Sequence, residues 1–397
     1  MEVVSDSKVS IRDIFASKAW SDFYEKNKDR IRVAVTDNIE KILACWSWEL
    51  WYWILKCKCG HEEKVPFTCK SRFCWRCWKK ACDNWMRKVI GWALPNIKYR
   101  HVVFTIPEEL RDFLLCNRNE WLDVLFKAST NALLYVFEKR YNCIPWIITV
   151  IHTFGGDIKW NPHVHVIVTH WWLSFNHKKW NYHHTIPHAL LKESWKYCLV
   201  KWLRDMAKEK MAAWSSEYRK FNEFLDFLYQ KKLYVNIWET LGSLEFTIQY
   251  IWRYAKRPVL AETRLENFDW KNVSFSFKDK LTKKKEVIAM DVNDFIGKLV
   301  RHIPDKYYRM IRYSWIFANR IKTKMLLIVQ NLLSQWEQRL VYLTKTPLSW
   351  REMKKKISWI DPYQCKCWKI MELVELVIML KSWWSKIVTL KELDYSP

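Results

Sequence analysis

Apolar and polar residues alternate along residues 161–168, which is the pattern of a half-buried β-strand. Side chains two positions apart share one face of a strand, so His163 and His165 are expected to point in the same direction. The valines at the alternate positions would pack into the core on the opposite face. Two imidazoles that project together from a rigid strand can hold one metal ion. The alternative is a polar strand face on which the histidines bind nothing.

The same patterns predict the other elements. Strands are expected at 99–105, 147–153, 233–237, 258–265 and 273–278. Helices are expected at 108–140, 186–210, 218–230 and 292–303, and over most of 1–44 and 321–397. The apolar stretches 326–333 and 373–380 are too short to span a bilayer and are interpreted as core helices. The resulting fold class is α+β, a central antiparallel sheet with flanking helices, preceded by a small cysteine-rich zinc unit and followed by a helical tail.

A second candidate for chemistry is a pair of tyrosines in the segment after Ser243, a residue suited to cap a helix. Tyr250 and Tyr254 are four positions apart, so a helix would place both hydroxyls on one face. A tyrosine hydroxyl can act as a covalent nucleophile. The alternative is aromatic packing, the commoner role of helical tyrosines.

Charge narrows the class of partner. The chain has 397 residues, with 67 lysines and arginines against 42 aspartates and glutamates, a formal net charge of +25. Such an excess favours a polyanionic partner, most simply nucleic acid, over a merely solvated basic surface. Residues 1–22 lack the apolar region of a signal peptide, so we expect a cytoplasmic protein.

The twelve cysteines are unevenly placed, with seven of them between positions 45 and 82. Without a secretory signal, this clustering favours metal binding over disulfides or buried free thiols. Two turns that each carry a cysteine pair can supply a tetrahedral thiolate site for Zn²⁺. The expected ligands are Cys57, Cys59, Cys74 and Cys77, with Cys69 as the first substitute.

Other residues near these cysteines have weaker or different expected roles. Cys45, Cys82 and His61 are less favoured as ligands. The distant pair Cys365 and Cys367 could complete a metal site with partners elsewhere, or could be two reduced thiols. The basic residues interleaved with the N-terminal cysteines are suited to contact DNA phosphates, namely Lys70, Arg72 and Arg76.

Taken together and in order, the motifs resemble a known family. His163-Val164-His165 resembles the His-hydrophobic-His signature, and Tyr250 with Tyr254 the paired tyrosines, of two-tyrosine HUH transposases of rolling-circle insertion sequences, the IS91-like family. Further blocks similar to that family lie at 151–157, 254–257 and 309–313, and the resemblance spans roughly residues 45–320. One departure is Lys58, a single residue between two cysteines where family members usually have two.

The resemblance implies a domain order. It consists of a helical arm (1–44), a zinc-binding domain (45–95), an HUH-type catalytic domain (96–320) and a helical C-terminal region with a cysteine pair (321–397). The histidines would lie on a central strand of the catalytic sheet. The implied partner is single-stranded DNA at the transposon ends and the target.

The implied chemistry is metal-assisted transesterification. One tyrosine would attack a DNA phosphate, leaving a 5′-phosphotyrosine and a free 3′ hydroxyl. Mg²⁺ or Mn²⁺ on His163 and His165 would polarise that phosphate, with His152 as the first and Gln249 as the second candidate for a third ligand. Flanking phosphates would be held by Arg253, Lys256 and Arg257. Two other functions stay open: a plasmid relaxase or replication initiator, and a non-catalytic zinc-dependent DNA-binding protein.

One feature of the composition is anomalous. The chain has 28 Trp and only 6 Gly, where average usage of about 7% would give roughly 28 Gly. Tryptophan stands where glycine is expected at several positions, among them Trp75, Trp78, Trp171, Trp172, Trp252, Trp315 and Trp368. We hypothesise that many are UGA codons read as tryptophan here but as glycine in the source organism. The alternative is a genuinely Trp-rich protein with aromatic surfaces that stack on DNA.

Overall fold

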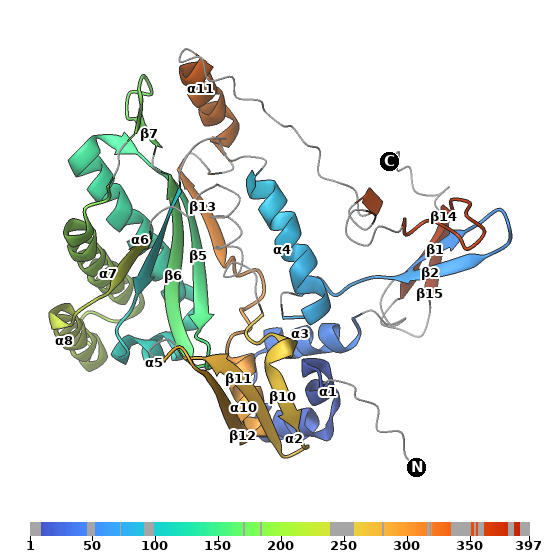
Figure 1. Ribbon diagram of the computed structural model, residues 1–397. Helices are drawn as coiled ribbons and strands as arrows, with labels where there is room; N and C mark the ends of the chain where they lie inside the picture. Colours follow the sequence, from blue (N-terminus) through green and yellow to red (C-terminus); the bar gives the residue numbers. More distant parts are fainter. Residues whose placement is uncertain are drawn as a thin grey trace.

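The computed structural model describes residues 9–45, 52–71, 73–90, 99–169, 171–182, 185–238, 258–279, 282–315, 318, 320–334, 351–352, 355, 361–379 and 385–389. At its centre is a five-stranded antiparallel sheet with the strand order β13-β5-β6-β3-β9 (Figure 1). Its strands are β3 (Tyr99–Thr105), β5 (Trp146–Phe154), β6 (Trp160–Thr169), β9 (Val235–Trp238) and β13 (Ile311–Trp315). The α+β class is confirmed, as are the strands expected at 99–105, 147–153, 161–168 and 233–237, with small changes at their ends.

The central strand β6 has two chemically different faces. Val164, Val166 and Val168 are completely buried in the main hydrophobic core. The alternate positions hold His163 and His165, as the period of two predicts. Strand pairing therefore decides which neighbours the histidines have on the opposite face of the sheet.

The apolar face of the sheet is covered by α5 (Glu109–Cys116), α6 (Arg118–Tyr141), α7 (His188–Lys210) and α8 (Ser216–Gln230) (Figure 1). The sequence predicts a continuous helix over 108–140, but the chain breaks at Asn117, whose φ of −117° and ψ of 46° are not helical. Helix α6 ends at Asn142, which adopts the left-handed conformation that commonly terminates helices. The helices expected at 186–210 and 218–230 are confirmed.

A second core joins segments that lie far apart in the sequence. It contains the N-terminal helices together with a three-stranded sheet and its flanking helix. These elements are α1 (Ile11–Ala16), α2 (Lys18–Asn27), α3 (Val33–Leu43), η1 (Glu262–Arg264), β10 (Leu265–Phe268), β11 (Asn272–Lys278), β12 (Lys285–Asp291) and α10 (Val292–Val300). From this core, α4 (Trp75–Ile90) runs along the side of the central sheet away from α6 and α7 (Figure 1).

The expected strand over 258–265 is wrong for most of its length. Residues up to 264 form a bend and the short 3-10 helix η1, and β10 begins only at Leu265. Val259 and Leu260 are adjacent, yet both are buried in the second core. A strand on a one-sided sheet would point adjacent side chains in opposite directions, so the compact bend buries both.

The expected helical tail is also wrong in part. The apolar stretch at 326–333 does lie in a helix, α11 (Lys322–Ser334), but 373–379 lies in a strand. This strand, β14 (Glu372–Met379), pairs with β1 (Tyr52–Lys56) and with β15 (Ser385–Thr389). Together with β2 (Glu62–Pro66) they form a sheet of order β15-β14-β1-β2, seen apart from the central sheet in Figure 1. The β-branched residues of β14 favour a strand where the edge of another strand is available for pairing.

A small fourth sheet among the described residues extends from the end of β6 and consists of β4 (Cys143–Ile144), β7 (Trp171–Ser174) and β8 (Trp180–Tyr182). Among the described segments, no helix has both the length and the apolar character that a membrane crossing requires.

The backbone separates the tryptophans into two groups. Trp368 has a left-handed φ of 67° and Trp270 a φ of 71°, and their side chains are 82% and 70% exposed. Apart from Asn and Asp, L-residues rarely adopt this conformation, and an exposed indole gains no packing there. Trp368 was expected to stand in for glycine, and its backbone agrees with that hypothesis; Trp270 adds a second such position.

At the other candidate positions the backbone gives no reason to expect glycine. Trp75 and Trp78 lie in α4 rather than in a tight turn, which corrects that expectation, because residues from 75 onward form α-helix. Trp171, Trp172 and Trp315 lie in strands, where φ is ordinarily negative. Trp252 lies outside the described residues.

We predict that Trp368→Gly and Trp270→Gly each raise the free energy of unfolding by about 1 kcal/mol, because glycine removes the left-handed strain. Trp214→Gly is the control, since Trp214 is 87% exposed but has no positive φ. It should leave stability unchanged or lower it, and urea denaturation measures all three. If the source organism inserts glycine, peptide mass spectrometry of the native protein will find glycine at 270 and 368; tryptophan there would refute the recoding hypothesis.

Candidate functional site

Three histidines meet on the face of the central sheet opposite α6 and α7. His152 in β5 pairs across the strands with His163 in β6, and His165 lies two positions further on. The candidate ligand atoms of this histidine cluster lie within 4.8 Å of one another. His152 and His165 are both 5% exposed, and His163 is half-buried. His152, the first sequence candidate for a third ligand, is therefore placed beside the expected pair.

Hydrogen bonds orient two of the three rings. Nδ1 of His163 donates to the carbonyl oxygen of Asn161 at 2.7 Å, which leaves its Nε2 with a lone pair. Nδ1 of His165 lies 2.8 Å from Nε2 of His101 in β3. Burial, aided by the nearby His163, lowers the pKa of His101 to about 4, so this ring is neutral near pH 7. A neutral His101 can accept the Nδ1 proton of His165, which leaves Nε2 of His165 available for a metal.

His101 is a residue that the sequence analysis missed. Its only signal was a position in the strand expected at 99–105, in which alternate residues share a face. The pairing of β3 with β6, which places Val103 opposite His165, could not be read from that strand alone.

The donor set of the histidine cluster fits a transition metal ion better than Mg²⁺. Among the described residues the cluster consists of three imidazoles and contains no carboxylate. Mg²⁺ prefers oxygen ligands in octahedral geometry, whereas imidazole nitrogens bind first-row transition metals. Of the two ions expected from the sequence, Mn²⁺ is therefore the better match.

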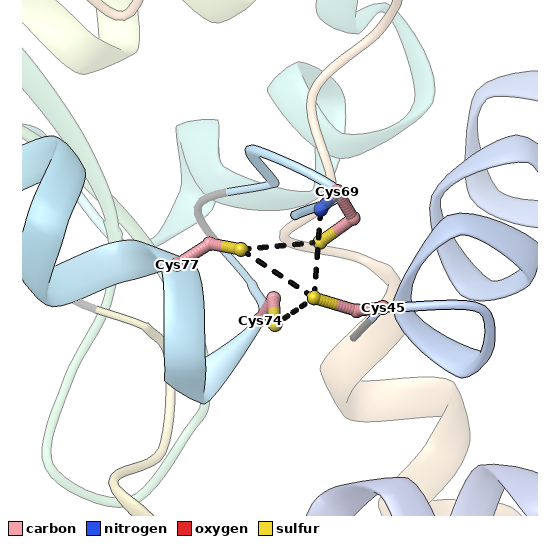
Figure 2. A group of neighbouring side chains, drawn as sticks. All are labelled: Cys45, Cys69, Cys74 and Cys77. Atoms are coloured by element: carbon pink, nitrogen blue, oxygen red, sulfur yellow. Dashed lines mark hydrogen bonds between the residues drawn. The ribbon is translucent and has the colours of Figure 1, made fainter. Parts of the chain in front are cut away.

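Figure 2 shows the first cysteine cluster, formed by Cys45, Cys69, Cys74 and Cys77. Cys45 follows the end of α3. Cys74 directly precedes α4, and Cys77 lies in its first turn. The Sγ–Sγ distances are 3.6 Å for Cys45–Cys77 and 3.5 Å for both Cys69–Cys77 and Cys74–Cys45. Four thiolates bound to zinc at about 2.3 Å would be about 3.8 Å apart, so the cluster is close to a tetrahedral site.

The electrostatics of this cluster favour a bound cation. Hydrogen bonds from the thiols of Cys69 and Cys74 lower the pKa of Cys45 to about 7. Hydrogen bonds from the thiols of Cys45, Cys69 and Cys74 lower the pKa of Cys77. The pKa values of Cys69 and Cys74 are instead raised. Four thiols this close cannot all ionise unless a metal ion compensates the charge, which is what Zn²⁺ supplies.

The expected zinc ligands are divided between two groups, which corrects the quartet inferred from the sequence. Cys74 and Cys77 belong to the first cluster, where Cys69 and Cys45 complete the set. Cys57 and Cys59 lie in a second cysteine cluster with Cys365 and Cys367. The reason is the hairpin β1–β2, which begins between Cys45 and Cys57 and carries the latter away from the start of α4. Cys45, judged a weak candidate from its sequence position, is a full member.

Comparisons with known proteins identify the family of the chain. A family model described as "Transposase zinc-binding domain" matches residues 15–106, and the Y2 model described as "Putative transposase" matches residues 147–324. The chain is 26% identical over 372 residues to the "Transposase for insertion sequence element IS801" of Pseudomonas savastanoi pv. phaseolicola, covering 89% of this chain and 86% of that protein. The chain belongs to the IS91-type Y2 transposases. It is also 22% identical over 320 residues to "Putative transposase y4qJ" of Sinorhizobium fredii, covering 78% of this transposase and 80% of that protein. No solved structure matches it significantly.

In this transposase helix α4, which begins at the first cysteine cluster, contacts the central sheet directly. The indole Nε1 of Trp85 in α4 donates to the hydroxyl of Tyr313 in β13 at 2.7 Å. Burial raises the pKa of Tyr313, so its hydroxyl stays neutral. Because α4 begins at the first cysteine cluster, that cluster sets the position of a helix alongside the central sheet (Figure 1).

Several expected site residues cannot be placed. The segment with both tyrosines and the basic residues after them lies outside the described residues, as does Arg72: Tyr250, Tyr254, Gln249, Arg253, Lys256 and Arg257. Arg76 lies in the first turn of α4, without a described side chain, and Lys70 is exposed just before it. Their roles as nucleophiles and phosphate contacts stay predictions.

We predict that His101→Phe weakens Mn²⁺ binding about 10- to 100-fold, because it removes the acceptor that fixes the tautomer of His165. His101→Gln restores a hydrogen-bonding group at that position and should recover part of the affinity. Titration of Mn²⁺ into zinc-loaded transposase by calorimetry or electron paramagnetic resonance measures both. Equal affinities for the wild type and His101→Phe would show that His101 does not position His165.

Proposed function

We propose that this transposase nicks and rejoins single-stranded DNA through a 5′-phosphotyrosine intermediate, and so drives rolling-circle transposition. The observation that carries the proposal is the histidine cluster, two histidines of one strand joined by His152 from the neighbouring strand, in a chain of the Y2 transposase family. A rigid group of imidazoles on one sheet face is suited to bind a metal at a phosphate.

The chemistry assigns a role to each group. The hydroxyl oxygen of Tyr250 or Tyr254 attacks phosphorus and loses its proton, the bond from phosphorus to the 3′ oxygen breaks, and that oxygen leaves as a 3′ hydroxyl. A 3′ hydroxyl of another strand later attacks the phosphotyrosine and releases the tyrosine. His152, His163 and His165 would hold a divalent metal ion, which would supply Lewis-acid polarisation of the scissile phosphate. Two tyrosines on one helix face would allow two successive transfers.

Binding of the DNA backbone is the second requirement. The net charge of +25 gives the chain a strong long-range attraction for a polyanion. Lys70 is exposed near the first cysteine cluster, and the basic segment after Tyr254 would follow the nucleophiles along the chain. These positions support single-stranded DNA at transposon ends and target as the substrate.

A covalent-adduct assay tests the proposal. Single-stranded DNA that carries a transposon end, incubated with the zinc-loaded transposase and Mn²⁺, should give a protein–DNA adduct that survives a denaturing gel. Tyr250→Phe with Tyr254→Phe should abolish the adduct, because no phenolic oxygen remains to attack phosphorus, while DNA binding persists. Tyr218→Phe, a change in α8 on the far side of the sheet, is the matched control and should react normally.

The result decides between this function and its alternatives. Undiminished adduct in the double variant would refute the assignment of the nucleophiles. Tight DNA binding without any adduct from the wild type would favour a non-catalytic DNA-binding protein.

A further inference from the structure

The same turn occurs twice in this chain, once near each end. In the first, the backbone N–H of Cys57 donates to the carbonyl of His61 at 2.8 Å, and that of Gly60 donates to the carbonyl of Cys57 at 2.9 Å. In the second, Cys365 donates to Lys369 at 2.9 Å and Trp368 donates to Cys365 at 2.8 Å. The relative positions of donors and acceptors are identical. Each turn is a Cys-Lys-Cys sequence followed by a residue of positive φ.

The two turns face each other through their sulfurs. Sγ of Cys57 lies 3.5 Å from Sγ of Cys367, and Sγ of Cys59 lies 3.6 Å from Sγ of Cys365. All four sulfurs lie within 4.8 Å of one another. These distances are far longer than a disulfide bond of about 2.05 Å but close to the separation of about 3.8 Å between thiolates on one zinc ion.

The surroundings also favour a metal over packed thiols. The local core consists of Leu55, Met371 and two of the cysteines, with three partly buried neighbours. A core of this size stabilises a four-stranded sheet poorly without a cross-link. A zinc ion with four thiolates carries a net negative charge, and the exposed Lys58 and Lys366 lie inside the turns where they can offset it.

We propose that Cys57, Cys59, Cys365 and Cys367 bind a second structural zinc ion, which fastens the C-terminal strands β14 and β15 to the N-terminal hairpin β1–β2. The linked cysteines are separated by 310 and 306 positions. The zinc-binding family model ends at residue 106 and so includes only one of the two turns. This zinc site is complete only when the C-terminal segment has been made and has folded back onto the N-terminal unit.

The proposal does not depend on the catalytic function and predicts a second metal ion. Zinc-replete full-length wild type should hold two zinc ions per chain at the cysteine clusters, besides any ion at the histidine cluster, and Cys365→Ser with Cys367→Ser should hold one fewer. Cys116→Ser is the control, because Cys116 is exposed and belongs to neither cysteine cluster; it should keep both ions. Equal zinc content in the double variant and the control would overturn the proposal.

Thiol labelling of the unmodified wild type gives an answer that does not rely on variants that fold. Cys59, Cys367 and Cys116 are all exposed, so without a metal all three should be open to reaction with iodoacetamide. With zinc bound, Cys59 and Cys367 should react at least tenfold more slowly than Cys116, and a chelator should remove that protection. Peptide mass spectrometry assigns each rate. Equal labelling of all three in zinc-replete protein, or protection removed only by a reductant, would overturn the proposal.

Discussion

Replacing His163 and His165 together by alanine should lower metal-dependent cleavage of single-stranded DNA by on the order of 10³-fold or more. A metal that polarises a phosphoryl oxygen contributes several kcal/mol to the transition state, and each 1.36 kcal/mol is a factor of ten in rate. The variant removes two of the three imidazoles of the histidine cluster. DNA affinity should change little, because the positive charge that attracts DNA is distributed along the whole chain.

Three measurements make this test specific. Single-turnover cleavage gives the rate, a fluorescence titration gives the DNA affinity, and circular dichroism confirms folding. His188→Ala is the control, since His188 lies at the start of α7 and its Nε2 donates to the carbonyl of Val235 at 2.7 Å, away from the cluster. Wild type should be more active with Mn²⁺ than with Mg²⁺, because the ligands are imidazoles. Cleavage that survives in a folded double variant would make the histidine pair structural.

The second large effect should follow loss of the first zinc site. Cys74→Ser with Cys77→Ser removes two of its four ligands. Structural zinc binding contributes about 10–16 kcal/mol in zinc-finger peptides, which is comparable with the whole stability of a domain. Because these cysteines are buried in the core shared by the N-terminal helices and β10–β12, we expect this second core to lose its cooperative folding.

Thermal unfolding and zinc analysis measure this effect. The double variant should lose a zinc ion and show either a greatly lowered Tm or no cooperative transition, and a chelator should do the same to wild type. Cys198→Ser is the control for a buried thiol outside both cysteine clusters, and should cost only the small penalty of a polar group in the core. An unchanged Tm in a variant that has lost its zinc would mean that this metal does not stabilise the fold.

Loss of the first zinc site should also reduce cleavage, although its cysteines touch no substrate. Helix α4 starts at this site and reaches β13 through the hydrogen bond from Trp85 to Tyr313. When the start of α4 is released, the helix is no longer held alongside the sheet that carries the histidine cluster. We therefore expect the first cysteine cluster and the central sheet to be coupled through α4.

The sequence by itself determined the elements whose pattern is local. The alternation at 161–168 predicted that the histidines share a face opposite the valines, because side chains alternate along any strand. The helical spacing at 186–210 and 218–230 likewise predicted α7 and α8. The sequence made His152 the first candidate for a third ligand, ahead of Gln249, and the pairing of β5 with β6 brings it to the other two histidines.

Only the tertiary structure decided what depends on distant partners. The stretch at 373–380 is apolar and could form a helix or a strand, and it becomes β14 because β1 offers a free edge to which it can hydrogen-bond. The direction of the β1–β2 hairpin, and not the spacing of the cysteines along the sequence, decides which cysteines form a cluster. Cys57 therefore lies beside Cys367 rather than Cys74. His101 joins the cluster only through the register of β3 on β6. A local pattern determines on which face of an element a side chain lies. The residues that it contacts there depend on pairing between distant segments, which the local sequence hardly determines.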